Sequence, residues 1–169
     1  EGAPAGAVSG TNGDSVASHG DLAVGSIAQS VGGGGGNGGL AIAIDGTRLT
    51  DTATGKAYTS VAIGGAGGDG ANGGDVTVNH SGAITATGDN AYGILAQSVG
   101  GSGGNAGLSL SAPLVSALDY TISTLLGARE GANGTAGTVT VNSTGTITVT
   151  GKNSEAIVAQ SVNGGGGNV

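Results

Sequence analysis

The chain has 169 residues, of which 40 are glycine and only three are aromatic, all of them tyrosine. With so few large side chains, small and β-branched residues must fill the interior in place of an ordinary aromatic-rich core. The formal net charge of -7 provides no basic surface for nucleic acid or an anionic membrane, and the absence of cysteine excludes a disulfide framework and a thiolate metal site.

A motif of Ala-Gln-Ser-Val followed by glycines organises the chain, and it begins at Ala28, Ala96 and Ala159. Each copy reads as a short apolar strand that runs into a glycine-rich loop. A glycine inside a strand costs roughly 0.5–1 kcal/mol relative to alanine. We therefore expect the loops to lie where the backbone turns tightly or packs closely, as corners of the fold.

Alignment on this motif divides the chain into three repeat units, residues 1–68, 69–129 and 130–169, with the last unit truncated. The segment from Gly74 to Val99 matches the third unit without a gap, at a constant offset of 63 residues. Agreement of this length is not produced by a biased composition alone. The chain is therefore predicted to be a repeat protein with one continuous architecture.

Near the start of each unit lies a two-strand segment, degenerate at residues 8–21 and clearer at residues 75–88 and 138–151. Apolar and polar residues alternate strictly in the second copy, which predicts β-strands. The predicted inner face carries Val76, Val78, Ile84 and Ala86, and the predicted outer face carries Thr77, Thr85 and Thr87. The breaks that begin at Asn79 and Asn142 consist of turn residues and predict corners.

Two segments vary between units. Asp45 to Ala57 reads as a polar loop. The stretch Ser111 to Leu126 has the apolar spacing of an amphipathic helix, but its second half aligns with the strand-like YTSVAIGGA that begins at Tyr58. We therefore predict a strand from Tyr120, and a loop or short helical turn over Ala112 to Leu118.

Short strands separated by glycine turns predict an all-β fold, a right-handed parallel β-helix (β-solenoid). With coils of about 20 residues, the chain would form about seven to eight coils. Stacked parallel strands satisfy the backbone by continuous ladders of hydrogen bonds, which offsets the entropy cost of so much glycine.

The motif GxIxAQSVGGGGGNGG, at residues 25–39 and 93–107, together with a VTVxxSGxITxTG segment, resembles the repeats of autotransporter passenger domains. The resemblance covers nearly the whole chain. Departures are Ser26 in the first copy, Asn163 in the last glycine loop, and the divergent start of the first unit. The resemblance implies a β-helical stalk of a large secreted protein of Gram-negative bacteria, displayed at the cell surface and often involved in adhesion; it brings no catalytic residues.

A glutamine recurs in each motif, at Gln29, Gln97 and Gln160. If Leu95 and Val99 point inward, strand alternation makes Gln97 point inward too, and a buried amide must be hydrogen-bonded. We therefore predict that the three glutamines have a structural role and hold the glycine loop that follows each of them.

Two aspartates are weak candidate calcium ligands. GGAGGDGANGGD, which contains Asp69 and Asp75, resembles one calcium-binding nonapeptide repeat, although Ala71 replaces the large apolar residue and the pattern is not tandem. We therefore expect solvated corner residues at both positions and no bound metal, with a calcium site as the alternative. The glycine loops lack the lysine and the helix start of a phosphate loop, so we expect no nucleotide and, calcium aside, no cofactor.

No reaction is indicated by the sequence. The acidic residues are scattered, so they form no pair for glycan hydrolysis, and neither His19 nor His80 stands in a recognisable nucleophile frame. We therefore expect no enzymatic activity.

The expected function is that of a stalk or binding surface for adhesion, in the passenger of a secreted autotransporter at the bacterial cell surface. The alternative is a self-assembling extracellular filament or surface-layer subunit. Expected partners are adjacent coils of a longer passenger or head-to-tail copies, and a host-surface protein or glycan bound at the variable segments Asp45 to Ala57 and Ser111 to Asp119. No apolar run approaches the roughly 18 residues of a membrane span and no signal peptide is recognisable, so we expect no direct membrane insertion of this segment.

Overall fold

The computed structural model describes residues 1–46, 57–114, 120–126 and 129–168. These residues form an all-β structure without helices, and so contain none of the long apolar helices that cross membranes. In chain order the strands are β1 (Val8–Asn12), β2 (Val16–His19), β3 (Val24–Val31), β4 (Ala41–Gly46), β5 (Ala57–Ile63), β6 (Val76–His80), β7 (Ala83–Thr87), β8 (Tyr92–Val99), β9 (Ser109–Leu114), β10 (Tyr120–Leu126), β11 (Val139–Ser143), β12 (Thr146–Thr150) and β13 (Glu155–Val162).

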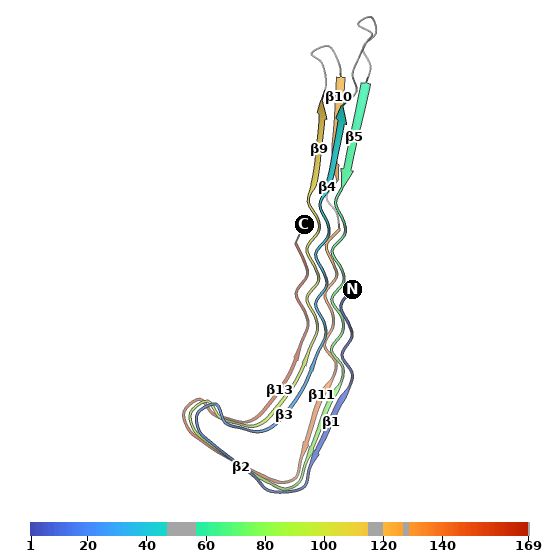
Figure 1. The fold of residues 1–169 in the computed structure, drawn as a ribbon. Helices are drawn as coiled ribbons and strands as arrows, with labels where there is room; N and C mark the ends of the chain where they lie inside the picture. Colours follow the sequence, from blue (N-terminus) through green and yellow to red (C-terminus); the bar gives the residue numbers. More distant parts are fainter. Residues whose placement is uncertain (47–56, 115–119, 127–128, 169) are drawn as a thin grey trace, which may run out of the picture.

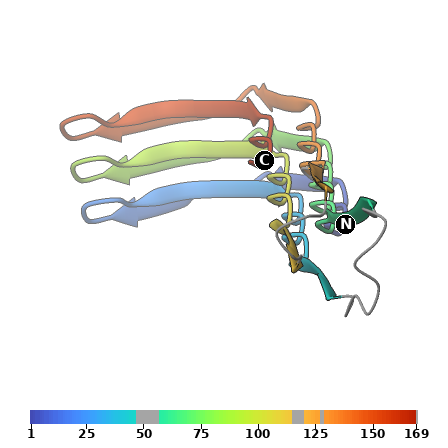
Figure 2. The same ribbon diagram turned by 90° about the horizontal axis from the view of Figure 1, so that it is seen from above.

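The strands stack in three layers, one for each repeat unit (Figure 2). Strands at the same place in each unit pair with one another, in the orders β1-β6-β11, β2-β7-β12 and β3-β8-β13, and two further pairs are β4-β9 and β5-β10. Every pairing is parallel. In the described residues the middle layer is therefore covered on both sides, while the first and third layers each have one open side.

One turn of the stack takes a whole repeat unit. Val76 pairs with Val8 of the layer before and with Val139 of the layer after, which are sequence separations of 68 and 63 residues. The expected coils of about 20 residues, seven to eight in number, are therefore not what the strand pairing shows. Successive short strands of one unit differ in sequence, so stacking them would place unlike side chains next to each other. Pairing each strand with the same strand of the next unit aligns similar side chains, and it aligns the glycines as well.

The core lies inside the hook that the first three strands of each unit form at one end of the molecule (Figure 1). Strands β6, β7 and β8 each turn one face toward the interior, and the predicted alternation in residues 76–87 is confirmed. The buried cluster consists of Ala28, Val76, Val78, Ile84, Ile94 and Ala96, with Val8, Val16, Val139, Val141 and Ile147 packed against it.

The sharpest corner of each layer joins its second and third strands. In the middle layer Gly88 has φ 138° and Asn90 has φ 56°, and the equivalent pairs are Gly20 with Leu22 and Gly151 with Asn153. Positive φ favours glycine, and asparagine tolerates it best among the other residues. The corners expected at Asn79 and Asn142 lie just beyond these residues, since both asparagines are still within strands β6 and β11.

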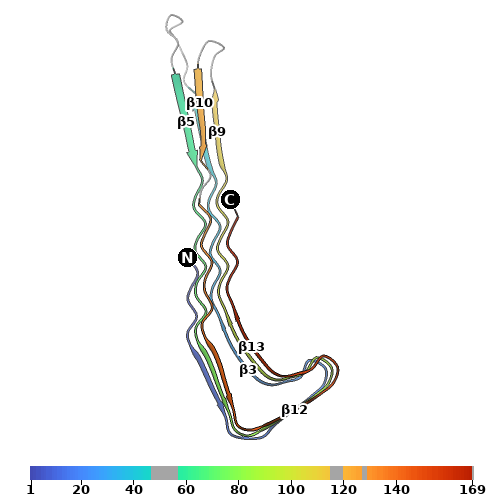
Figure 3. The same ribbon diagram turned by 180° about the vertical axis from the view of Figure 1, so that it is seen from behind.

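The glycine loops are extended rows and not corners, contrary to the sequence-based expectation. Figures 1 and 3 show them running side by side between the hook and the far strands β4, β5, β9 and β10. We call residues 1–7, 64–75 and 129–138 the inbound rows, because they lead into the hook, and residues 32–40, 100–108 and 163–168 the outbound rows. Each inbound row is counted with the layer whose hook it enters, so the second layer begins at residue 64. Among the described residues, positive φ at glycine is confined to Gly20, Gly88 and Gly151, outside the rows.

Hydrogen bonds between the rows repeat every third residue. Gly67, Gly70 and Gly73 donate to carbonyls of the next inbound row, and Gly65, Gly68 and Ala71 donate to the outbound row of the layer before. Three residues per turn is the period of a polyproline II helix, which has no internal hydrogen bonds. Each row therefore depends on its neighbours for backbone hydrogen bonds.

The rows pack so closely that most of their glycines have no room for a side chain. A Cβ added at Gly35 would overlap the carbonyl oxygen of Gly68, and one at Gly104 would overlap that of Gly36. The part of the expectation that invoked close packing is thus confirmed, and the part that invoked tight turns is wrong.

The two aligned segments that begin at Tyr58 in the first unit and at Tyr120 in the second unit are both strands. The strands predicted from Tyr58 and Tyr120 are present as β5 and β10, which pair with each other. Strand β9 reaches Leu114, so the loop or helical turn predicted from Ala112 is wrong over its first three residues. The remainder of that prediction, and most of the polar loop predicted over Asp45 to Ala57, lies outside the described residues.

Candidate functional site

The outer face of the sheet β3-β8-β13 carries a ladder of glutamines. Gln29 donates its Nε2 to Oε1 of Gln97 at 2.7 Å, and Gln97 donates in the same way to Gln160 at 2.6 Å. Apolar side chains run along both sides of the ladder, with Ile27, Leu95 and Val158 on one side and Val31, Val99 and Val162 on the other. We call this surface the amide face.

The predicted direction of Gln97 is wrong. In β8 the fully buried residues are Ile94, Ala96 and Ser98, so Leu95, Gln97 and Val99 belong to the opposite, outer face. Both faces of this strand carry apolar residues, so alternation alone left two orientations open. The sequence reasoning chose the wrong one because it took Leu95 and Val99 as the inner set.

A serine next to each glutamine holds the glycine rows instead. The hydroxyl of Ser98 donates to the carbonyl of Gly74 at 2.8 Å and accepts the N–H of Gly137 at 2.8 Å. Ser30 makes the same two contacts one layer earlier, donating to the carbonyl of Gly6 at 2.9 Å and accepting the N–H of Gly74 at 2.9 Å. A single buried hydroxyl thus joins two layers at the point where each inbound row enters the hook.

Sequence reasoning missed these serines as functional residues of the fold. The available signal was their recurrence at Ser30, Ser98 and Ser161, in a strand whose neighbouring residues are apolar. A hydroxyl that recurs at an inward position requires a partner for both its donor and its acceptor functions. Ser161 supplies the donor half again, with its hydroxyl 2.9 Å from the carbonyl of Gly137.

Side-chain oxygens of Asn and Asp run along the outside of the rows. Asp69 Oδ1 accepts the N–H of Ala132 at 2.8 Å, and Asp75 Oδ1 accepts the N–H of Thr138 at 2.7 Å. Asn72 does the same for Thr135 at 2.9 Å. Both candidate calcium ligands therefore bond to the backbone of the next layer.

The two aspartates do not form a metal cluster with other residues. Within the described ranges, no three His, Cys, Asp or Glu side chains come close enough together to hold an ion. Asp69 also borders a pocket of about 180 Å³ with Arg129 and Glu130, where charges of both signs are present. The positive charge of Arg129 in the lining of this pocket disfavours a bound cation there.

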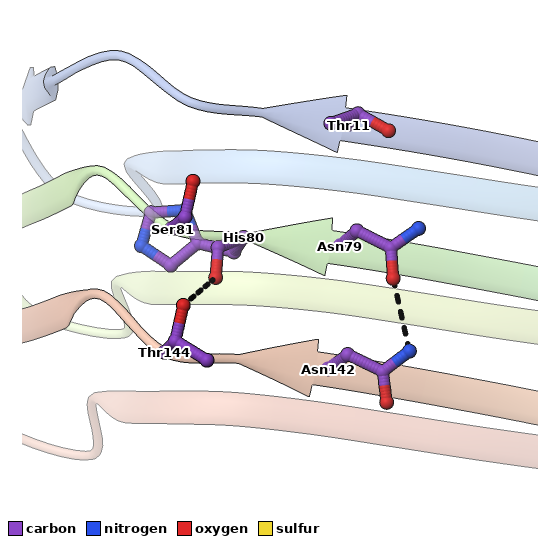
Figure 4. Close-up of a pocket in the computed structure, with 6 residues that line it drawn as sticks. All are labelled: Thr11, Asn79, His80, Ser81, Asn142 and Thr144. Atoms are coloured by element: carbon purple, nitrogen blue, oxygen red, sulfur yellow. Dashed lines mark hydrogen bonds between the residues drawn. The ribbon is translucent and has the colours of Figure 1, made fainter.

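A second pocket, of about 200 Å³, opens where the second layer leaves β6 (Figure 4). It is lined by Thr11, Asn79, His80, Ser81, Asn142 and Thr144. Asn142 donates its Nδ2 to Oδ1 of Asn79 at 2.9 Å, and Thr144 donates its backbone N–H to the carbonyl of His80 at 2.9 Å. The lining includes no carboxylate, so it provides no acid-base pair for His80.

His80 is buried, and among the residues that the structure describes neither of its ring nitrogens has a hydrogen-bond partner. Its neighbours in register are Asn12, whose Nδ2 is likewise buried and unpartnered, and Ser143. Buried polar groups of this kind are commonly satisfied by an internal water. His19 lies elsewhere, with its Nδ1 2.6 Å from Oγ1 of Thr87, so the two histidines are not brought together.

Comparison with known proteins assigns no family to this chain. No protein-family model matches the chain, and neither the curated proteins nor the solved structures contain a match.

Proposed function

We propose that the chain is a structural and adhesive segment of a secreted bacterial surface protein, resembling the passenger of an autotransporter. The observation that supports the proposal most is the register of the layers: in the described residues, each strand pairs only with the same strand of another unit. An architecture of this kind lengthens by one layer for each added repeat, which suits a stalk.

We further propose that the stack is part of a parallel β-solenoid whose coil is one repeat unit. Right-handed winding is the expected hand, because parallel connections in one sheet are right-handed in nearly all proteins. The location would be extracellular, at the surface of a Gram-negative bacterium. No catalytic step and no bound cofactor form part of the proposal.

The amide face is the surface that we assign to adhesion. It runs along the stacking direction, and each layer repeats the same order of apolar, amide and apolar side chains. Ile27, Val31 and Val162 are exposed on it. Such a surface offers apolar contact area together with amide groups, which are able to hydrogen-bond to a host protein or glycan.

Surface display tests this proposal. Gram-negative cells that display the chain should attach to host epithelial cells more strongly than cells that carry the empty anchor. A displayed variant with Leu95→Lys and Val99→Lys should attach no more strongly than the empty anchor, because both substitutions place charges on the amide face. A control with Thr77→Lys and Thr85→Lys, on the outer faces of β6 and β7, should keep the stronger attachment. Equal attachment by the folded chain and the empty anchor would refute the adhesive role.

A self-assembling filament is the second candidate, because the open sides of the outer layers favour it. Strands β1, β2 and β3 lie at one end of their sheets, and β11, β12 and β13 lie at the other. Unpaired strand edges are templates for pairing with another chain. Size-exclusion chromatography and negative-stain imaging separate the candidates, since a stalk segment stays monomeric and a filament subunit forms fibres.

A further inference from the structure

The third layer differs from the other two at positions where its outbound and inbound rows meet the open side. Asn163 stands where the first two layers have Gly32 and Gly100, and Asn133 stands where the second layer has Gly70. These equivalences follow from the offset of 63 residues that relates β8 to β13 and β6 to β11, and from the offset of 68 residues that relates β3 to β8.

At Asn163 the difference is steric. A Cβ added at Gly32 would overlap the carbonyl oxygen of Ala71 in the next layer, and one at Gly100 would overlap that of Gly134. Asn163 carries a Cβ at this position. A fourth layer packed like the second and third would therefore collide with it.

Both asparagines also occupy hydrogen bonds that a next layer would use. The carbonyl of Gly101 accepts the N–H of Gly134 from the layer above, at 2.8 Å. In the third layer the equivalent carbonyl belongs to Gly164, and it accepts Nδ2 of Asn133 at 2.8 Å.

The second case is the N–H of Gly73, which donates to the carbonyl of Thr135 in the layer above, at 2.8 Å. The equivalent donor in the third layer is Ala136, whose N–H donates to Oδ1 of Asn163 at 2.8 Å. Two side-chain amides thus occupy the positions that backbone amides of a neighbouring layer occupy in the second layer.

Two hydrogen bonds join the rows of the third layer on either side of Asn133; the one from Gly164 to Gly134 keeps its length at 2.9 Å, and the other is longer than its equivalent in the second layer. The N–H of Gly104 donates to the carbonyl of Gly68 at 2.8 Å, whereas the equivalent bond from Gly167 to Gly131 is 3.4 Å. The open side of the first layer is different, because a Cβ added at Gly36 or Gly39 would meet nothing within 4 Å. Gly36 and Gly39 are the equivalents of Gly104 and Gly107, at which an added Cβ would overlap the layer before them. The first layer thus has glycine at the positions that a preceding layer would approach closely.

We propose that Asn133 and Asn163 form an amide cap that closes the third layer, while the open side of the first layer is a docking surface for another layer of this repeat. The partner that it fits is a glycine-packed layer without the cap. Copies of this chain therefore do not stack end to end, which argues against the filament considered above as the second candidate. This inference rests on the packing of the layers and not on the adhesive role, so a failed attachment assay leaves it standing.

A variant without the amide cap tests this proposal, because its third layer should fit the open side of the first layer of another copy. The substitutions Glu130→Gly, Asn133→Gly and Asn163→Gly restore the glycine pattern of the second layer, in which Gly67 is the equivalent of Glu130. We expect the wild type to remain monomeric by light scattering at all concentrations, and the uncapped variant to form elongated stacks that lengthen with concentration. Adding Gly36→Ala and Gly39→Ala to the uncapped variant should return it to monomers, because these methyl groups are harmless in the free chain and block the docking surface.

Mixing sharpens the test. Wild-type chains should shorten the stacks of the uncapped variant, because they dock through the first layer and end growth with their capped third layer. Wild-type chains that carry Gly36→Ala and Gly39→Ala should have no effect. Head-to-tail fibres of the wild type, or a folded uncapped variant that stays monomeric, would overturn the proposal. If circular dichroism shows the triple variant unfolded, Asn163→Gly alone is tested in the same way, since it removes the colliding Cβ.

Discussion

Ser98 donates its hydroxyl to the carbonyl of Gly74 across 2.8 Å, and the side chain is fully buried at 0 % exposure. The same oxygen accepts the N–H of Gly137 from the third layer. The strand of the hook and the glycine rows of two layers are therefore joined at one atom. This contact holds the face of β8 that carries Ser98 toward the interior. It also connects the packing of the glycine rows to the packing of the core.

Replacing Ser98 with alanine should destabilise the protein by about 2–4 kcal/mol. Two backbone groups, the carbonyl of Gly74 and the N–H of Gly137, would lose a partner inside the protein, and each unsatisfied buried group costs about 1–3 kcal/mol. Denaturation in urea provides the measurement. Ser102→Ala is the matched control, because Ser102 is exposed in an outbound row, and it should change the free energy of unfolding by less than about 0.5 kcal/mol. Equal effects of both substitutions would contradict the role of Ser98.

The two equivalent glycines Gly104 and Gly36 should respond in opposite ways to alanine. At Gly104 the new methyl group would overlap the carbonyl of Gly36, and at Gly36 it would meet open space. We expect Gly104→Ala to cost about 3 kcal/mol or more, or to prevent folding. Gly36→Ala should be neutral or stabilising by up to about 1 kcal/mol, because it reduces the freedom of the unfolded chain.

Thermal unfolding followed by circular dichroism measures this pair. The comparison controls for the sequence change itself, since both variants exchange the same residue types at equivalent places in successive layers. A similar melting temperature for the two variants would contradict the close packing of the rows.

The strands could be predicted from the sequence where one face is apolar and the other is polar. Val76, Val78 and Ile84 alternate with threonines, and the period of two fixed both the strands and their inner face. In β8 the same reasoning failed, because Leu95 and Val99 on one face are as apolar as Ile94 and Ala96 on the other. The inward face of β8 is instead determined by the hydrogen bonds of Ser98, whose partners Gly74 and Gly137 are far away in sequence.

The number of layers could not be predicted for a related reason. A short strand of five residues does not specify its partner, so stacking within a unit and stacking between units were both compatible with the pattern. The glycine rows decide between them, since Gly35 fits against Gly68 only when whole units lie in register. Their period of three is hidden in the outbound row at residues 32–40, because seven of its nine residues are glycine.

Gln97→Leu should change stability by less than about 1 kcal/mol, and by less than Ser98→Ala does. Gln97 lies on the outer face, where water replaces the lost amide partners of Gln29 and Gln160. The added apolar surface should instead raise the tendency to aggregate. Urea denaturation and static light scattering check the two parts of this prediction. A loss larger than that of Ser98→Ala would show that the glutamine, and not the serine, holds the rows.

Asp75→Asn should leave stability unchanged within about 0.5 kcal/mol. Asp75 accepts the N–H of Thr138 through one oxygen, and Asn72 makes the same contact with an amide oxygen, so the charge is not required. Asp75→Ala removes the acceptor and should cost about 0.5–1.5 kcal/mol, the usual net value of one hydrogen bond. Unfolding is measured with calcium and with a chelator. For the wild type the two melting temperatures should agree, because Asp69 and Asp75 are engaged with the backbone of the next layer. A rise in melting temperature with calcium that Asp75→Asn abolishes would instead establish a calcium site at this row.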